Sequence, residues 1–239
     1  MHPHLEPLAL LHRDTHLVAV FKPAGLLVHR TMLDAHETDD VVTRLQAQLG
    51  VPVWPAHRLD KGTSGVLLLA LDAATAAHLG ASFAQGAARK QYLAWVRGWP
   101  ADTGETQRPL ARDPELPSQG QPQLEACTRW QVIDRQTLPL QTHADHAGTR
   151  VALVQIEPLT GRRHQIRRHF KALAHPLIGD ATHGKGPLNR AIAQHLGVAR
   201  LWLHAQQLVI PHPATGQPLT LQAQPGAEWA LWPGPDAAA

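Results

Sequence analysis

The sequence contains very little cysteine, tyrosine and lysine. Cys127 is the single cysteine among 239 residues, so the chain can form neither an internal disulfide nor a cluster of thiolate metal ligands. This usage is compatible with a reducing compartment. Tyr92 is the single tyrosine, and only 5 of the 22 basic residues are lysines. Arginine therefore carries most of the positive charge.

Long hydrophobic runs are also missing. No uninterrupted apolar segment is long enough to cross a membrane, and the first residues, MHPHLEPLALLHRD, lack the basic region and apolar core of a signal peptide. We therefore expect a soluble, cytoplasmic protein. The length and the 44% hydrophobic content allow one large domain or two small lobes with a shared core. We predict one domain over 1–239, with a core at about 12–224 and a flexible tail at 233–239.

The hydrophobic patterns predict a mixture of helices and strands without regular alternation. Strands are expected at 16–25, 66–71, 90–98 and 150–158, with a hairpin around the ATGQ turn, and helices at 41–50, from Asp72 towards 89, and at 163–174. Residues 100–123 are predicted to form an extended surface excursion with short hairpin strands. This order favours an α+β fold around a largely antiparallel sheet.

Positive charge is concentrated in one segment. Although the net charge is only +3, the stretch RRHQIRRHFK from Arg162 to Lys171 contains five Arg or Lys and two His in ten residues. Ile166, Phe170 and Leu173 recur there at helical spacing, opposite the basic residues. The segment therefore predicts a helix with an RNA-binding face, and a solvated charged face is the alternative interpretation.

A carboxylate stands between two cations in the stretch AHRLDKGTSGVLLLA. Asp60 is flanked by Arg58 and Lys61, and a small GTSG segment leads into an apolar strand that we expect to be buried on both faces. A surface ion pair would explain this arrangement equally well, because such pairs are common and contribute only about 0 to 1 kcal/mol.

Three other patterns point to chemistry less strongly. GDATHGKG at 179–186 approaches a phosphate-binding loop, but Gly186 replaces the residue that would hold magnesium and Pro187 is expected to interrupt the following helix. The HADH stretch at 143–146 has no supporting helical period or nearby ligand, so we predict no metal site. Ser64 lacks the surroundings of a nucleophilic serine.

Four motifs together resemble the RluA-type family of RNA pseudouridine synthases. They are HRLDKGTSGVLLLA, KQYLAWVRG, LTGRRHQIRRHFKALAHPLIGDATHG and RLWLHAQQL, which occur in this order, and the resemblance extends from about Leu17 to Ala223. It implies the pseudouridine synthase fold, with a mainly antiparallel central sheet, flanking helices and a catalytic cleft. The implied activity is the isomerisation of uridine to pseudouridine in RNA.

The resemblance also implies roles for single residues. Asp60 corresponds to the catalytic aspartate, Tyr92 to the active-site tyrosine and Arg167 to the arginine that pairs with the aspartate. The residues expected to bind RNA or the extruded base are Arg58, Arg162, Arg163, His164, Gln165, Arg168 and Leu203. Because the reaction involves neither oxidation nor net hydrolysis, no cofactor is expected.

Two details point to a substrate within the family. The LVHR stretch after KPAG and the segment NRAIAQHLGVARLWLHA resemble the synthase C type, which modifies uridine 65 of tRNA. No room precedes the first strand for an added RNA-binding module of the S4 type, so a monomer is expected to recognise tRNA with the catalytic domain itself. The alternatives are a synthase that acts on large-subunit ribosomal RNA and a non-catalytic RNA-binding protein on the same scaffold.

Overall fold

The computed structural model describes residues 6–30, 39–141 and 148–233, which form two compact units. Unit 1 comprises Met1–Lys90 and Ala205–Gln224, and unit 2 comprises Gln91–His204 and Pro225–Ala239. In the part of the chain that is described, no helix combines the length and the apolar character needed to cross a membrane. The HADH stretch and all but the first residue of the expected tail lie outside the described residues.

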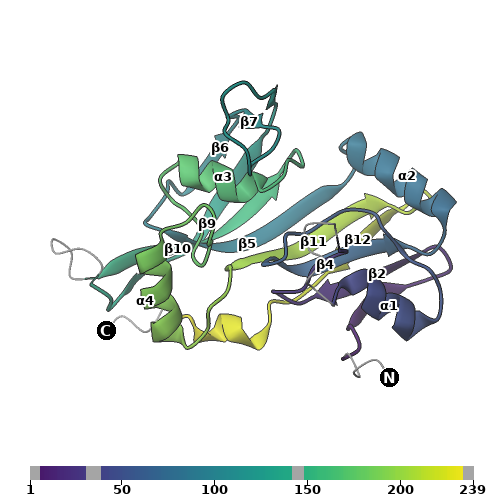
Figure 1. Cartoon of the computed structure of the whole chain (residues 1–239), viewed down its shortest axis with the longest axis horizontal. Helices are drawn as coiled ribbons and strands as arrows, with labels where there is room; N and C mark the ends of the chain where they lie inside the picture. The colour runs from purple at the N-terminus through teal and green to yellow at the C-terminus, as the bar shows by residue number, and fades with distance from the viewer. Residues whose placement is uncertain (1–5, 31–38, 142–147, 234–239) are drawn as a thin grey trace. The chain divides into compact units, whose positions relative to one another are not determined.

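Unit 1 is a sheet with two helices. Its strands follow the order β1-β2-β4-β11, with β3 beside β4 and β12 beside β11, and the ladders β1–β2, β2–β4, β3–β4 and β11–β12 are antiparallel. Figure 1 labels β2, β4, β11 and β12 of this sheet. The elements are β1 (Leu10–Arg13), β2 (Leu17–Lys22), α1 (Val41–Leu49), β3 (Trp54–Pro55), β4 (Ser64–Ala70), α2 (Ala73–Ala84), β11 (Leu203–Pro211) and β12 (Pro218–Gln222). Strand β11 begins with the last two residues of unit 2.

Most unit 1 elements form where the sequence predicts them, whereas the short strands β1 and β3 were not predicted. Every residue of β4 is buried, as expected for a strand covered on both faces. Asp72 caps α2 by accepting a hydrogen bond from the backbone N–H of Thr75, and Gly50 ends α1 in the left-handed conformation. Helix α2 ends at Ala84, earlier than the pattern towards residue 89 indicates.

Gly65 of the TSG sequence allows β4 to approach β11 closely. A Cβ atom at this position would lie 2.1 Å from the carbonyl oxygen of Ala205, and the backbone φ of +117° also disfavours any other residue. Glycine is therefore required at the point where the Asp60 segment enters the sheet.

Unit 2 is an antiparallel sheet of strand order β5-β10-β9-β6, with helix α3 contacting β9 and β10. A separate two-stranded ladder joins β7 to β8. The elements are β5 (Arg89–Arg97), β6 (Thr103–Thr106), β7 (Leu110–Ala111), β8 (Gln123–Leu124), β9 (Thr128–Leu138), β10 (Thr149–Pro158), α3 (Gln165–Ala172), α4 (Gly186–Leu196) and the 3₁₀ helix η2 (Ala227–Leu231). The first two residues of β5 belong to unit 1.

Two clusters form the core of unit 2. One joins β5 and β10 to α3 through Val96, Val154, Ile166 and Phe170. Two of the three residues of the predicted apolar face are thus buried, whereas Leu173 follows the end of α3 and is half-buried. The other packs Ile192 of α4 against a group of tryptophans in which Trp95 stacks on Trp232 with ring centroids 4.1 Å apart. Both units are thus α+β with antiparallel ladders, which confirms the predicted fold class.

The structure corrects one prediction about α4. Pro187 was expected to interrupt a helix at this point, but α4 begins at Gly186 with the proline in its first turn. The N–H groups of the first turn have no partner inside the helix, so proline loses no hydrogen bond there and its fixed φ suits the helix. Short strands do occur within 100–123, as β6, β7 and the first residue of β8, but β7 is buried and β6 pairs with the distant strand β9.

Candidate active site

Asp60 lies in unit 1, at the start of the turn that leads into β4. It is half-buried, its carbonyl oxygen accepts a hydrogen bond of 3.0 Å from the N–H of Thr63, and Arg58 beside it is exposed. The turn is held by the preceding KPAG segment, because the N–H of Gly25 donates to the carbonyl of Lys61 at 2.8 Å. A rigid backbone therefore carries the candidate nucleophile.

A buried cation strengthens this attachment. Lys22 has no exposed surface, and its Nζ donates to the carbonyl oxygens of Leu26 at 2.7 Å, Pro23 at 3.0 Å and Lys61 at 3.1 Å. Three backbone carbonyls thus converge on an ammonium group, which carries three donors. Lys22 thus connects the KPAG turn to the residue directly after Asp60, a role that the sequence pattern of a strand and turn did not reveal.

His57 fixes the other end of the same segment. Its Nε2 accepts a hydrogen bond of 3.1 Å from the N–H of Leu68, a residue of β4. Burial, assisted by the positive charge of Lys90, lowers the pKa of His57 from 6.5 to about 4. The imidazole is therefore neutral at neutral pH and can act as this acceptor.

Tyr92 and Leu203 lie in unit 2 and share one hydrophobic cluster. Tyr92 is half-buried on β5, opposite Ile156 of β10, and packs against the cluster that contains Leu203, Ile166 and Phe170. The structure therefore brings the candidate tyrosine and the candidate apolar wall together with α3, the helix that carries Arg167.

Arg167 forms a bidentate ion pair with Asp180. Its Nε and Nη2 each donate to one carboxylate oxygen of Asp180 at 2.8 Å, and the two side chains are 9% and 0% exposed. Burial alone would raise the pKa of Asp180, but the hydrogen bonds from Arg167 and from the N–H of His183 outweigh burial and lower it. Both partners are thus charged at neutral pH.

Asp180 was not among the predicted site residues, although the sequence contains a signal for it. It is the only carboxylate between Glu157 and Glu228, a stretch that includes eight Arg or Lys residues. GDATHGKG resembles a phosphate-binding loop, and GDATHG also ends one of the four family motifs, but neither pattern assigned a role to Asp180. A lone acid in a basic stretch is a better indication of an ion pair than of a nucleotide site.

His164 and Gln165 form the beginning of α3. Nδ1 of His164 lies 3.0 Å from Nε2 of His183, and burial lowers the pKa of His183 to about 4. Gln165 is buried, and all four of its side-chain hydrogen bonds are made within unit 2. Its amide N–H groups donate to the carbonyl of Cys127 and to Oγ1 of Thr128. Its amide oxygen accepts from Oγ1 of Thr160 and from the backbone N–H of Arg162. Gln165 therefore fastens the TGR turn, and contact with RNA would require it to give up one of these bonds.

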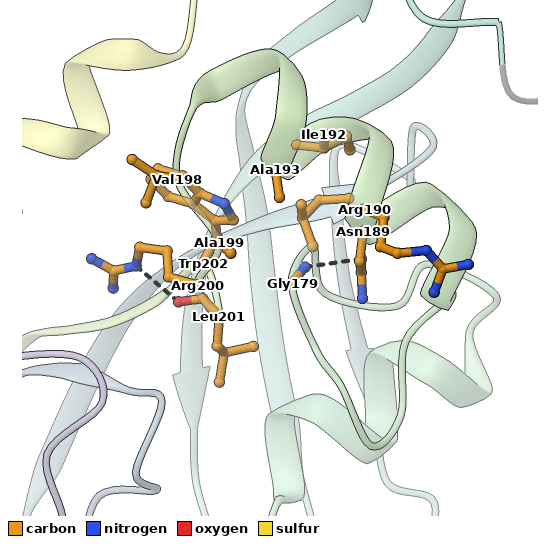
Figure 2. Close-up of a pocket in the computed structure, with 11 residues that line it drawn as sticks. Gly179, Asn189, Arg190, Ile192, Ala193, Val198, Ala199, Arg200, Leu201 and Trp202 are labelled. Atoms are coloured by element: carbon orange, nitrogen blue, oxygen red, sulfur yellow. Dashed lines mark hydrogen bonds between the residues drawn. The ribbon is translucent and has the colours of Figure 1, made fainter.

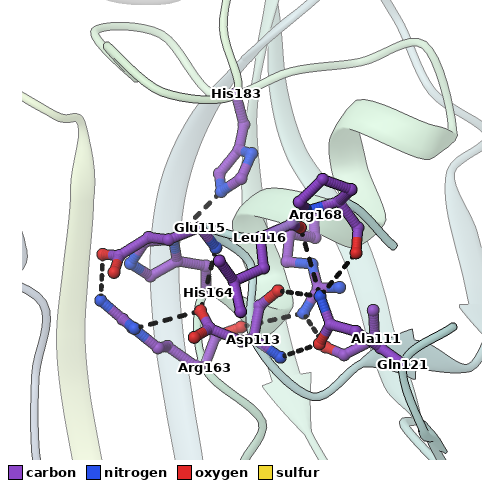
Figure 3. A network of polar contacts seen from close by, with 10 residues as sticks. Ala111, Asp113, Glu115, Leu116, Gln121, Arg163, His164, Arg168 and His183 are labelled. Carbon is purple, nitrogen blue, oxygen red and sulfur yellow. Dashed lines mark hydrogen bonds and ion pairs between the residues drawn. The ribbon is translucent and has the colours of Figure 1, made fainter. Parts of the chain in front are cut away.

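The basic residues around α3 contact the surface excursion (Figure 3). Nη1 of Arg168 donates to the Ala111 carbonyl at 2.9 Å, and Arg163 pairs with Asp113 and Glu115. Arg162 is exposed, although its Nε donates to the Glu125 carbonyl at 2.8 Å. The predicted cationic face is present, but carboxylates of the same unit already neutralise part of it.

A hollow of about 260 Å³ also lies in unit 2, beside α4 (Figure 2). Ile192 and Val198 line it together with Asn189, whose side-chain oxygen accepts a hydrogen bond from the N–H of Gly179. None of the predicted site residues lines this hollow. Within the described ranges, no group of three or more His, Cys, Asp or Glu side chains is arranged to hold a metal ion.

Comparison with known proteins defines the class to which this arrangement belongs. Residues 16–172 match the family described as RNA pseudouridylate synthase. The chain belongs to this family, as the four motifs implied, and is an RNA pseudouridine synthase.

Several curated relatives are similar over nearly the whole chain. The tRNA pseudouridine synthase C of Vibrio cholerae serotype O1 is 41% identical over 227 residues, with 93% of each chain covered. That of Pasteurella multocida is 42% identical over 233 residues, again with 93% of each chain covered. That of Salmonella typhi is 42% identical over 233 residues, covering 93% of this chain and 87% of the relative.

Solved structures support the same fold. The human RNA pseudouridylate synthase domain containing 1 superposes with a TM-score of 0.72 at 26% identity, and the match covers 94% of this chain and 86% of that one. The human RNA pseudouridylate synthase domain containing 4 gives a TM-score of 0.68 at 25% identity, covering 93% and 90%.

Proposed function

We propose that this protein converts uridine to pseudouridine in tRNA, at uridine 65, and that Asp60 is its nucleophile. The observation that carries the tRNA assignment is the 41 to 42% identity, over 93% of the chain, to synthases named for tRNA. The LVHR and NRAIAQHLGVARLWLHA segments, which resemble the synthase C type, support uridine 65 as the target.

The reaction needs a group that attaches to the nucleoside and leaves again. The N1–C1′ bond of uridine breaks, the base turns, and C5 joins C1′; the proton lost from C5 is balanced by the one gained at N1. A carboxylate is suited to such reversible attack. The proposed role of Asp60 is consistent with its position on a turn that Lys22 and His57 hold in place.

The other proposed roles follow from the chemistry of each side chain. The ring of Tyr92 stacks on the extruded base, and its hydroxyl assists removal of the C5 proton. Arg167 is proposed as the cationic partner of the nucleophile, because a guanidinium stays charged when it is buried. Arg58, Arg162, Arg163, His164, Arg168 and Leu203 are proposed to contact the RNA, and Gln165 to hold the segment that presents them.

The energetic problem of the reaction is base extrusion. Taking a paired base out of a stem costs a few kcal/mol, and arginine contacts to backbone phosphates offset that cost.

We infer a monomer that acts in the cytoplasm on a folded RNA. Its mass in solution, measured by light scattering with and without tRNA, tests the monomeric state.

The substrate is tested with unmodified transcripts. Purified protein is incubated with tRNA transcripts and with fragments of large-subunit ribosomal RNA, without added cofactor or metal, and pseudouridine is mapped in both. Product at uridine 65 of tRNA alone is the expected result. Product in ribosomal RNA alone would refute the substrate, while binding without product in either RNA would indicate a non-catalytic RNA-binding protein.

A further inference from the structure

We propose that Asp180 is a positioning residue of the reaction, which holds the guanidinium of Arg167 in the orientation that catalysis requires. This inference rests on the proposed function, in which Arg167 supports the nucleophile Asp60. It adds a second carboxylate to the reaction, one that acts through Arg167 without touching the substrate.

The geometry of the pair leaves Arg167 little freedom. Two parallel hydrogen bonds of 2.8 Å join the Nε and Nη2 edge of the guanidinium to both oxygens of Asp180. Such a bidentate contact fixes the plane of the guanidinium as well as its distance from the carboxylate. A monodentate contact would allow the plane to rotate.

Asp180 is itself held from several directions. Its Oδ1 also accepts hydrogen bonds from the N–H groups of Thr182 at 2.9 Å and His183 at 2.8 Å. Its backbone carbonyl accepts from the N–H of Gly184 at 3.0 Å and from Nδ2 of Asn189, a residue of α4, at 2.9 Å. The carboxylate is therefore a fixed point of unit 2 to which Arg167 is attached.

The chemistry of a guanidinium allows it to serve two carboxylates at once. Its five N–H donors lie in one plane and form two edges, so a group that binds one carboxylate along the Nε edge directs its other edge elsewhere. Asp180 engages the Nε edge. The direction of the other edge is therefore fixed by the contact with Asp180.

The balance of buried charge also favours a role for Asp180 in holding Arg167. Asp180 and Arg167 are both buried, and a charge buried without a partner is strongly disfavoured. By neutralising Arg167, Asp180 allows the cation to stay buried whether or not the nucleophile is attached to substrate. The positioning is thus maintained throughout the catalytic cycle.

The variant Asp180→Asn tests the proposal. The amide keeps the shape of the side chain, but its NH₂ group faces a guanidinium N–H and cannot accept from it, so one of the two bonds is lost. Under single-turnover conditions with saturating enzyme, we expect the rate to fall at least about tenfold, because misplacing a reacting group by about 1 Å can cost on the order of 100-fold. RNA affinity should be unchanged.

A double-mutant cycle separates positioning from simple stabilisation of the fold. In an Arg167→Lys background, Asp180→Asn should slow the reaction little further, because the group that it positions is already gone. Glu228→Gln is the matched control, since Glu228 pairs with Arg200, an arginine of unit 2 whose side chain is largely covered. It should lower the melting temperature without changing the rate of the folded enzyme.

A measurement that does not depend on activity completes the test. In the wild type, the Nε–H signal of Arg167 in ¹⁵N NMR should be protected from exchange with water, and Asp180→Asn should remove that protection. An Asp180→Asn variant as fast as an active wild type would overturn the positioning role alone. A wild type that modifies no RNA would overturn the proposed function as well, so the two failures are distinguishable.

Discussion

Lys22 and Arg167 are two cations that the fold buries, and their charges are satisfied in different ways. Lys22 donates to three backbone carbonyls, whereas Arg167 meets the carboxylate of Asp180. An ammonium group is a compact donor suited to converging carbonyls, and a guanidinium is a planar fork suited to a carboxylate. The type of each cationic side chain therefore matches the acceptors around it. Lys22 contacts the segment next to Asp60, and Arg167 is itself a proposed catalytic residue.

Replacement of Tyr92 by phenylalanine separates its two proposed roles. Tyr92→Phe retains the ring that packs against the Leu203 cluster but removes the hydroxyl. We therefore expect turnover to fall far more than RNA affinity, as measured by single-turnover kinetics and by filter binding on the same preparation. Equal losses in both would indicate a binding or core residue.

The low pKa of the half-buried His57 makes the stability of the protein depend on pH. Because burial lowers the pKa of His57 from 6.5 to about 4, the unfolded chain binds more protons than the folded protein between these values. The contribution of the neutral His57 to the free energy of unfolding is therefore fully present above pH 6.5, and it declines as the pH falls towards 4. The variant His57→Gln, which retains an acceptor for the Leu68 N–H, should lose less of its melting temperature between about pH 7 and about pH 5.

The control for this experiment is His78→Gln, a replacement of an exposed histidine on α2 of the same unit. It should leave the pH dependence of the melting temperature as it is in the wild type. If His57→Gln and the wild type lose stability in parallel over this range, the neutral imidazole does not contribute as described.

At the scale of elements, the sequence predicted those whose pattern is local and regular. Strand β4 follows from an unbroken apolar run, α2 from the Asp72 cap and α1 from the glycine that ends it. Strand β9 was not predicted, because its eleven residues alternate between buried or half-buried and exposed positions but include several charged side chains. Its place in the sheet depends on pairing with β10, which local sequence does not specify.

The candidate site residues were likewise predictable where the signal lies in a continuous stretch of sequence, and not where it depends on contacts between distant segments. Asp60, Tyr92 and Arg167 were selected because they fall within long motifs of known order, not because their spacing revealed a role. The contacts of Arg167 with Asp180 and of Lys22 with Lys61 were not predicted, since both join positions that only the folded chain brings together. Asp180 lies 13 residues after Arg167, and Lys61 lies 39 residues after Lys22.

The cationic face of α3 supports a prediction about salt dependence. Each phosphate contact contributes about 0.7 to 0.9 to the slope of log affinity against log salt concentration. Replacing Arg162 and Lys171 together by alanine should therefore flatten the slope for tRNA. Arg163→Ala should flatten it less, because Asp113 and Glu115 already pair with that guanidinium.

A matched control for this measurement is Arg135→Ala on β9, which removes an exposed arginine that pairs with Asp102 at 2.5 Å. Its slope should equal that of the wild type. An unchanged slope and affinity for the Arg162 and Lys171 double variant would mean that the face of α3 is only solvated and does not contact RNA.

At the scale of the whole molecule, the proposed roles divide between the two compact units. Asp60 and Arg58 belong to unit 1, whereas Tyr92, Arg167 and Leu203 belong to unit 2. Sequence composition allowed either one large domain or two lobes, and the single catalytic domain remains a prediction. Family membership was predictable from the sequence, because the motifs extend through both units and the comparisons cover nearly the whole chain.

The central claim is that the carboxylate of Asp60 carries the isomerisation. It is tested most directly by measuring the release of tritium from tRNA labelled at C5 of uridine, with the wild type and with Asp60→Asn at equal, saturating concentrations. We predict that the variant folds and binds tRNA like the wild type but releases no tritium at uridine 65, because an amide keeps the shape of the carboxylate but is no nucleophile. Residual turnover within about tenfold of the wild type, a change in barrier of only about 1.4 kcal/mol, would contradict the account.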